Sequence, residues 1–270
     1  MVHGYRVIDA HCHIYPPRIA AAAVRGTDKF YDLHSVYNGT TDDLLTRSHA
    51  AGVDRCIVQS VATTPNQVKS INEFIAAEVA ANEGQFIGLG TLHPDSRDMA
   101  GDVAHLQELG LRGVKLHPDI QQFKIDDYRC LKIYELCERE GLPILLHTGD
   151  SRFDYSNPNR LLPVMNIYSG LTVVGAHLGG WSVWDEAVDK LAGLPNLYVD
   201  TCSCFAFMDR QKIKDIILAY GTDRVLFGTD YPMWPMADET EALLSLRLSE
   251  EDNRKILAEN AEKVFGLATK

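Results

Sequence analysis

The chain has 270 residues, of which 46% are hydrophobic and 23% charged, and its formal net charge is −11 at pH 7. This length and composition are typical of a globular protein with a substantial core. The acidic balance argues against nucleic acid or an anionic membrane as a partner, because both attract basic surfaces.

Short apolar, β-branched runs alternate with amphipathic helical segments along the chain. We predict strands at 6–13, 54–61, 86–93, 113–118, 143–149, 171–180, 197–204 and 225–232. The clearest helices are predicted at 66–84, 126–141, 210–221 and 249–267. Mostly apolar strands separated by helices indicate a parallel sheet covered by helices. Eight such units predict an α/β fold, a (β/α)₈ TIM barrel, as a single domain over residues 1–270. A doubly wound open sheet is the alternative.

Two segments lack a clear element and are predicted to be loops over the active face of the barrel. The first covers residues 14–40, after the first strand, and the second covers residues 150–160, after the fifth. Long loops at that position of a barrel commonly act as lids or bind substrate.

Polar side chains end five of the predicted strands. They are His11 and His13 on the first strand, Lys115 and His117 on the fourth, His147 on the fifth, His177 on the sixth and Asp230 on the eighth. Residues at i and i+2 of a strand point the same way, so each of the first two pairs faces one side of the sheet. In a barrel enzyme the reacting groups lie at these strand ends. Imidazole nitrogens with a carboxylate suit a borderline divalent metal ion, so we predict a metal site.

Six segments carry a more specific resemblance: "DAHCH", "GVKLHPDIQQF", "GLPILLHTG", "VVGAHLGG", "NLYVDTCS" and "RVLFGTDYP". In this order the sequence resembles the amidohydrolase superfamily of TIM-barrel metal-dependent hydrolases. The resemblance is to the branch that includes aminocarboxymuconate-semialdehyde decarboxylase, and it spans nearly the whole chain.

The resemblance implies that His11, His13, His147 and Asp230 are metal ligands. It also implies that His177 polarises the substrate or transfers a proton, and Asp230 could share that role. Asp9 would either orient an imidazole from behind or form hydrogen bonds in the core.

Lys115 leaves two alternatives open. A carboxylated lysine at this place bridges two metals in binuclear members of the superfamily, whereas beside a single metal it would be a charge-paired interior residue. We favour one divalent ion. Zinc is expected, with manganese, iron, cobalt and nickel as alternatives.

A metal with an open position can activate water, so the expected function is hydrolysis of an amide, lactone or ester-like bond in a small molecule. The alternative is non-oxidative decarboxylation of a small unsaturated or aromatic acid, and a third hypothesis is metal binding without turnover. Substrate contacts are expected from His117, Arg152 and Trp181. A decarboxylase would need a cationic clamp, for which Arg152, Arg160 and Arg18 are candidates.

The remaining expectations concern location and partners. The N-terminus does not have the pattern of a signal peptide, and no apolar run approaches the ~20 residues of a membrane-spanning helix. The six cysteines form no CxxC pair, so we expect reduced thiols and a cytoplasmic protein. A small-molecule substrate is the expected partner, and a homodimer is left open.

Overall fold

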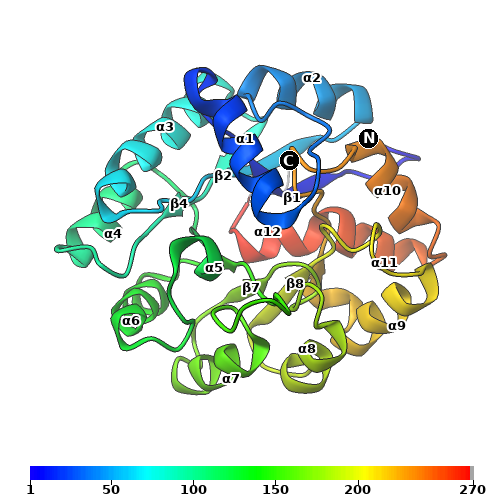
Figure 1. Ribbon diagram of the computed structural model, residues 1–270. Coiled ribbons are helices and arrows are strands. Elements are labelled where there is room, and N and C mark those ends of the chain that lie inside the picture. The colour runs from blue at the N-terminus through cyan, green and yellow to red at the C-terminus, as the bar shows by residue number, and fades with distance from the viewer. Residues whose placement is uncertain (268–270) are drawn as a thin grey trace.

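The computed structural model describes residues 1–267 as one α/β domain in which helices surround parallel strands (Figure 1). The strands are β1 (Ile8–His13), β2 (Arg55–Gln59), β3 (Phe86–Gly88), β4 (Gly90–Thr91), β5 (Val114–Leu116), β6 (Ile144–Leu146), β7 (Val173–Gly175), β8 (Leu197–Asp200) and β9 (Val225–Leu226). Paired strands are parallel and follow the chain order, β1 to β3 in one sheet and β4 to β9 in another. β3 and β4 are the two halves of the predicted third strand.

Backbone hydrogen bonds join the two sheets into a closed barrel. Between β3 and β4, the N–H of Leu89 still donates to Val58 O at 2.9 Å. At the other junction, the N–H of Ala10 donates to Phe227 O at 2.9 Å and that of His13 donates to Tyr231 O at 2.7 Å. Because the last strand pairs with the first, no sheet edge remains among the strands of residues 1–267, and the predicted TIM barrel is confirmed over the open sheet.

The helices are α1 (Pro17–Tyr31), α2 (Thr41–Ala51), α3 (Val68–Ala81), α4 (Met99–Glu108), α5 (Pro118–Gln121), α6 (Leu131–Glu140), α7 (Pro158–Ile167), α8 (Trp184–Leu191), α9 (Arg210–Tyr220), α10 (Met236–Leu244), α11 (Glu250–Arg254) and α12 (Asn260–Val264). Short 3₁₀ turns lie at η1 (Pro65–Gln67), η2 (Tyr128–Cys130) and η3 (Thr222–Arg224), and η4 (Lys255–Glu259) is a π-helical turn. Among the described residues, no helix is both long and apolar enough to cross a membrane. All six cysteines are buried and free.

Alternation along the strands divides the apolar residues into an outer and an inner core. On β6, Ile144 and Leu146 pack in the large outer cluster beneath the helices, whereas Leu145 packs in a smaller cluster inside the barrel. Ala261 of α12 and Phe265 join this inner cluster. The C-terminal segment therefore closes one end of the barrel, and the polar site lies at the other, where the strands end.

Helix α1 corrects the expectation that residues 14–40 form a loop. Pro17 occupies its first turn and an alanine run follows, both of which favour a helix. Its N-cap, Pro16, makes no side-chain cap hydrogen bond, so the usual start signal was missing from the sequence. In the second expected loop, residues 150–157 contain no helix or strand, and α7 begins at Pro158.

Glu239 on α10 is a buried carboxyl whose Oε2 has no hydrogen-bond partner. Burial, reinforced by Asp9, raises the pKa of Glu239 to about 8. Above pH 4.5 the unfolded chain releases this proton while the folded chain keeps it, so stability falls as pH rises towards 8. We expect Glu239→Gln to raise the free energy of unfolding at pH 9 by roughly 1–3 kcal/mol, with little change at pH 4.

Urea unfolding at pH 4, 7 and 9 measures this effect. Glu241→Gln is the matched control, since Glu241 lies on the same helix with an exposed side chain. Parallel pH profiles for the unchanged chain and Glu239→Gln would contradict the prediction.

Candidate active site

Alternation on the strands turns a ring of polar side chains towards the barrel interior. Leu116 and Leu146 pack in the outer core. Lys115 and His117, which flank Leu116, and His147, which follows Leu146, therefore point inwards. All three are at most 5% exposed. Polar groups this deeply buried need partners, and the site supplies them.

A bulge in β1 aims both of its histidines at the same interior. The pairing of β1 with β2 shifts between Asp9 and Cys12, and such a shift re-aims the following side chains. Asp9 does not contact an imidazole in the structure. Its Oδ1 accepts the backbone N–H groups of His11 at 3.1 Å and Thr229 at 3.0 Å. Its role is therefore the core hydrogen bonding that the sequence left as an alternative.

His177 and Asp230 lie beyond the ends of their strands, not within them as predicted. Both have a φ of 59°, a left-handed conformation that is uncommon for residues other than glycine. The backbone N–H of His177 donates to Asp200 Oδ1 at 2.8 Å, and Ser203 Oγ donates to Asp230 Oδ2 at 2.6 Å. These contacts hold the two strained turns, and such strain is frequent at functional sites.

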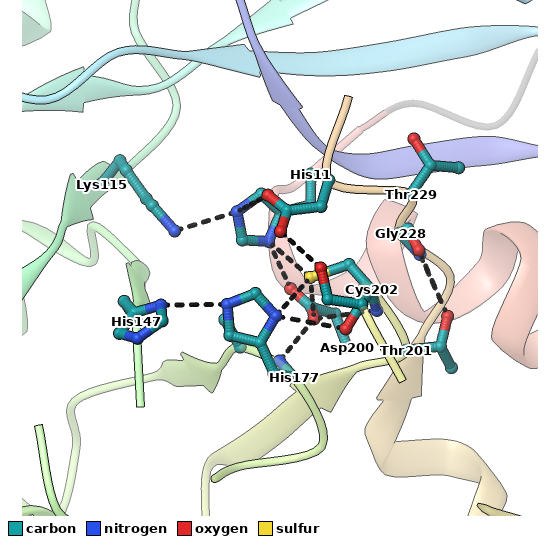
Figure 2. Close-up of polar contacts among 12 residues, drawn as sticks. His11, Lys115, His147, His177, Asp200, Thr201, Cys202, Gly228 and Thr229 are labelled. Atoms are coloured by element: carbon teal, nitrogen blue, oxygen red, sulfur yellow. Dashed lines mark hydrogen bonds and ion pairs between the residues drawn. The ribbon is translucent and has the colours of Figure 1, made fainter. Parts of the chain in front are cut away.

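Three of the imidazoles have an acceptor at their outer nitrogen. His11 Nδ1 lies 2.8 Å from Asp200 Oδ2, His177 Nδ1 lies 3.1 Å from Cys202 O, and His147 Nε2 lies 3.1 Å from Gly149 O. Each acceptor binds the N–H of its ring and so fixes the tautomer. The other nitrogen of each ring is left with a lone pair. Figure 2 shows His11, His147 and His177 around this centre, with Asp200 and Cys202 behind two of the rings.

The inner nitrogens meet each other at short range. His11 Nε2 lies 3.2 Å from His13 Nε2, and His147 Nδ1 lies 2.9 Å from His177 Nε2. Asp230 Oδ1 lies 3.5 Å from His11 Nε2 and 3.7 Å from His13 Nε2. Lone pairs this close repel unless a proton or cation lies between them. His11 and Asp230, with Cys202, lie close enough together to hold a metal ion, and His147 does so with His117 and Asp119. Imidazole and carboxylate donors of this kind suit a divalent ion.

Burial sets the charge state of these groups. It lowers the pKa of His13 and of His147 well below the usual value for histidine, so both rings are neutral near pH 7. Burial by itself would raise the pKa of Asp230, but His11 and His177 lower it to about 2. Neutral imidazoles beside an ionised carboxylate are the forms in which these residues bind metals.

Lys115 is a buried amine beside His11. Its Nζ lies 3.0 Å from His11 Nε2, as Figure 2 shows. Among residues 1–267, no carboxylate lies within ion-pair distance of it, so the expectation of a charge-paired lysine was wrong. Burial lowers the pKa of Lys115. An incoming anion would favour its charged form.

The site opens into a cavity of about 830 Å³, whose lining includes His117 and Trp181. His117 Nδ1 accepts the backbone N–H of Ile120 at 3.3 Å, so its Nε2–H donates to Tyr31 Oη at 2.7 Å. Burial raises the pKa of Tyr31, which keeps its phenol proton. Because Tyr31 lines the cavity, its phenol can donate a hydrogen bond to a ligand. Tyr31 was missed in the sequence because it was placed in a loop.

Arg152, an expected substrate contact and candidate clamp, forms contacts within the protein. Its Nη2 pairs with Asp150 Oδ2 at 2.7 Å, and its Nη1 donates to Phe30 O at 2.6 Å. It therefore fastens the 150–157 loop to the end of α1. Arg160 is similarly paired with Asp126 at 2.7 Å. Arg18 is the one of the three candidate arginines that lines the cavity formed by the described residues.

Comparison with known proteins identifies the family. The sequence model of the amidohydrolase family matches residues 8–267. The chain belongs to the amidohydrolase family. A curated relative, the 2-amino-3-carboxymuconate-6-semialdehyde decarboxylase of Dictyostelium discoideum, is 24% identical over 238 residues. The match covers 73% of this chain and 66% of that relative. The chain lies in the branch of the family that resembles this decarboxylase.

Solved structures share the barrel. An uncharacterised TIM-barrel protein from Bordetella bronchiseptica has a TM-score of 0.82 and 23% identity, covering 97% of this chain and 99% of its own. A dihydroxybenzoic acid decarboxylase from Polaromonas, with bound manganese and 2-nitroresorcinol, has a TM-score of 0.76 and 18% identity. That match covers 98% of each chain. At these identities the likeness concerns the fold.

The comparisons correct the expected reaction of this amidohydrolase. The curated relative and the Polaromonas protein are both decarboxylases. Hydrolysis of an amide, lactone or ester-like bond was therefore the wrong expectation, and the alternative is the better supported. The preference for hydrolysis rested on the lack of an arginine at a strand end beside the histidines. In the structure the amine of Lys115 lies at that place, 3.0 Å from His11 Nε2.

Asp200 is the main site residue that the sequence analysis passed over. It ends β8 and is fully buried. Both of its oxygens act in the site, Oδ2 on the His11 ring and Oδ1 on the backbone of His177. A signal was present, because Asp200 is charged, ends an apolar run and has the same inward parity as Tyr198 of the inner core.

Proposed function

We propose that this protein is a metal-dependent, non-oxidative decarboxylase of a small unsaturated or aromatic carboxylic acid. The observation that carries the proposal is that His11 Nε2 lies within 4 Å of His13 Nε2, Asp230 Oδ1 and Lys115 Nζ, while His147 Nδ1 meets His177 Nε2 at 2.9 Å. The similarity to a curated decarboxylase supports this reaction over others that such a centre could perform.

One divalent cation would be held by the Nε2 atoms of His11 and His13, by His147 Nδ1 and by Asp230 Oδ1. Manganese, the ion in the Polaromonas enzyme, is the first to test, with zinc second. When bound, the ion would draw electron density from the carboxylate and a neighbouring oxygen of the substrate. Lys115 would pair with the same carboxylate and so act as the cationic clamp for which arginines were the expected candidates.

His177 would move the proton that the reaction needs. The carbon–carbon bond to the carboxylate breaks, carbon dioxide leaves, and the electron pair stays on the substrate carbon. His177 Nε2, which otherwise carries a lone pair, would take up a proton from solvent and deliver it to that carbon, which forms the new C–H bond. The carbonyl of Cys202 holds the Nδ1–H of the ring, so Nε2 faces the centre throughout. Tyr31 and His117 would bind a further oxygen of the substrate.

The product of turnover tests this proposal. The manganese-supplemented protein should release carbon dioxide from a panel of hydroxybenzoates and unsaturated amino acids that includes the acids named for its relatives. In deuterium oxide, the product should carry one deuterium on the carbon that lost the carboxylate. In oxygen-18 water the product should carry no oxygen-18, because decarboxylation forms no new bond to a solvent oxygen. An oxygen-labelled product without carbon dioxide release would contradict decarboxylation.

A further inference from the structure

The cavity is larger than a simple hydroxybenzoate requires. Its volume of about 830 Å³ lies in the upper part of the roughly 300–1,000 Å³ that sites for drug-sized ligands span. The reacting groups His11, His13, His177 and Asp230 line part of it. From there the cavity extends between α1 and α3, which are neighbours in Figure 1. We call this extension the annex and define it by its lining residues Ile19, Ala23, Gly26, Ile71 and Phe74.

The polar residues beside the annex use their polar groups in hydrogen bonds to the backbone, so the wall of the annex is mainly apolar. Thr27 Oγ1 donates to the carbonyl of Ala23 at 3.3 Å, and Ser70 Oγ donates to the carbonyl of Gln67 at 3.1 Å. Gln67 Oε1 in turn accepts the backbone N–H of Thr63 at 2.8 Å. These hydroxyl and amide groups form hydrogen bonds with the nearby backbone. What they present to the cavity is mainly carbon, which favours an apolar ligand group.

Gly26 enlarges the annex at a cost to the helix. A glycine inside a helix is about 1 kcal/mol less favourable than alanine. A Cβ added at Gly26 would meet nothing within 4 Å, and its φ lies outside the left-handed region. Neither backbone conformation nor tight packing therefore requires glycine here. Gly26, which is exposed and also lines the cavity, leaves the cavity side of α1 open together with Ala23 one turn earlier.

We propose that the annex binds an apolar substituent of the substrate. The natural substrate would then be an unsaturated or aromatic acid that bears an alkyl or aryl group, with its carboxylate at the histidine centre and this group between α1 and α3. This inference rests on the proposed decarboxylation only for the identity of the reacting group, the carboxylate. The apolar character of the annex does not depend on it. The annex is continuous with the site, so the group that fills it belongs to the molecule that reacts.

Binding measurements test the annex independently of turnover. The probes are 2-hydroxybenzoate and two series of its derivatives, with straight alkyl chains of one to six carbons at position 4 or position 5. Calorimetry with the manganese-supplemented protein gives each dissociation constant. Affinity should rise about two- to fourfold per methylene in at least one series, as expected for burial of CH₂ groups. A flat response in both series would overturn the proposal.

Substitutions on α1 locate the effect. Ala23→Leu and Gly26→Leu should weaken binding of the hexyl probe at least about tenfold and leave 2-hydroxybenzoate within twofold. Ala22→Leu is the matched control, since Ala22 is exposed and adjacent on the same helix. Equal losses in Ala22→Leu and Ala23→Leu would also overturn the annex. If affinity rises with the length of the alkyl chain but the unchanged protein releases no carbon dioxide from any acid tested, the proposed decarboxylation is contradicted and the annex is not.

Discussion

Replacing His177 with asparagine should lower turnover about a hundredfold or more, the usual scale for loss of a general acid or base. Metal content should stay near that of the unchanged protein, because His11, His13, His147 and Asp230 remain to bind the ion. Asparagine can keep the backbone N–H bond to Asp200, which does not involve the side chain. Its amide cannot take up and release a proton near pH 7, so the chemical step loses its proton donor.

Steady-state rates and metal analysis on the same preparation check this prediction. His93→Asn is the control, since His93 is a buried histidine at the end of the third predicted strand but is not among the described residues that line the cavity. It should keep both metal and activity. If His177→Asn instead strips the metal, His177 is a ligand and the proposed proton transfer is wrong.

Asp200→Asn should weaken metal binding about ten- to a hundredfold, which is typical when the group behind a ligand histidine is changed. The carboxylate accepts both the ring N–H of His11 at 2.8 Å and the backbone N–H of His177 at 2.8 Å. An asparagine can accept only through one oxygen. Whichever way the amide lies, its NH₂ group then faces one of these two donors. If it faces His11, the favoured tautomer changes and Nε2 loses its lone pair.

Titration of manganese against a competing chelator measures the loss for Asp200→Asn, and activity should recover in part at saturating metal. Asp9→Asn is the control, because Asp9 is an equally buried carboxylate that holds backbone N–H groups and contacts no imidazole. It should lower thermal stability without a comparable loss of metal affinity. Equal metal affinity in Asp200→Asn and the unchanged protein would contradict the role of Asp200.

Much of the architecture could be predicted from the sequence because it depends on local pattern. Each apolar run between amphipathic segments forms a strand, and eight such runs have one closed parallel arrangement that buries them all. The inward direction of Lys115, His117 and His147 follows from strict alternation on strands. Strand ends were less accurate. β7 and β9 end at Gly175 and Leu226, before the left-handed residues His177 and Asp230.

The sequence by itself determined the barrel, the family and the group of histidines and Asp230 at the strand ends. Only the tertiary structure decided which groups meet. Asp200 and His11 are 189 residues apart, and Tyr31 reaches His117 across 86 residues, so no local pattern records either contact. For the same reason, the contact of Lys115 with His11 and the ion pair of Arg152 with Asp150 could not be predicted. Which side chains contact each other in a closed barrel depends on the distances between its strands and loops. The alternation of residues along one strand carries no information about those distances.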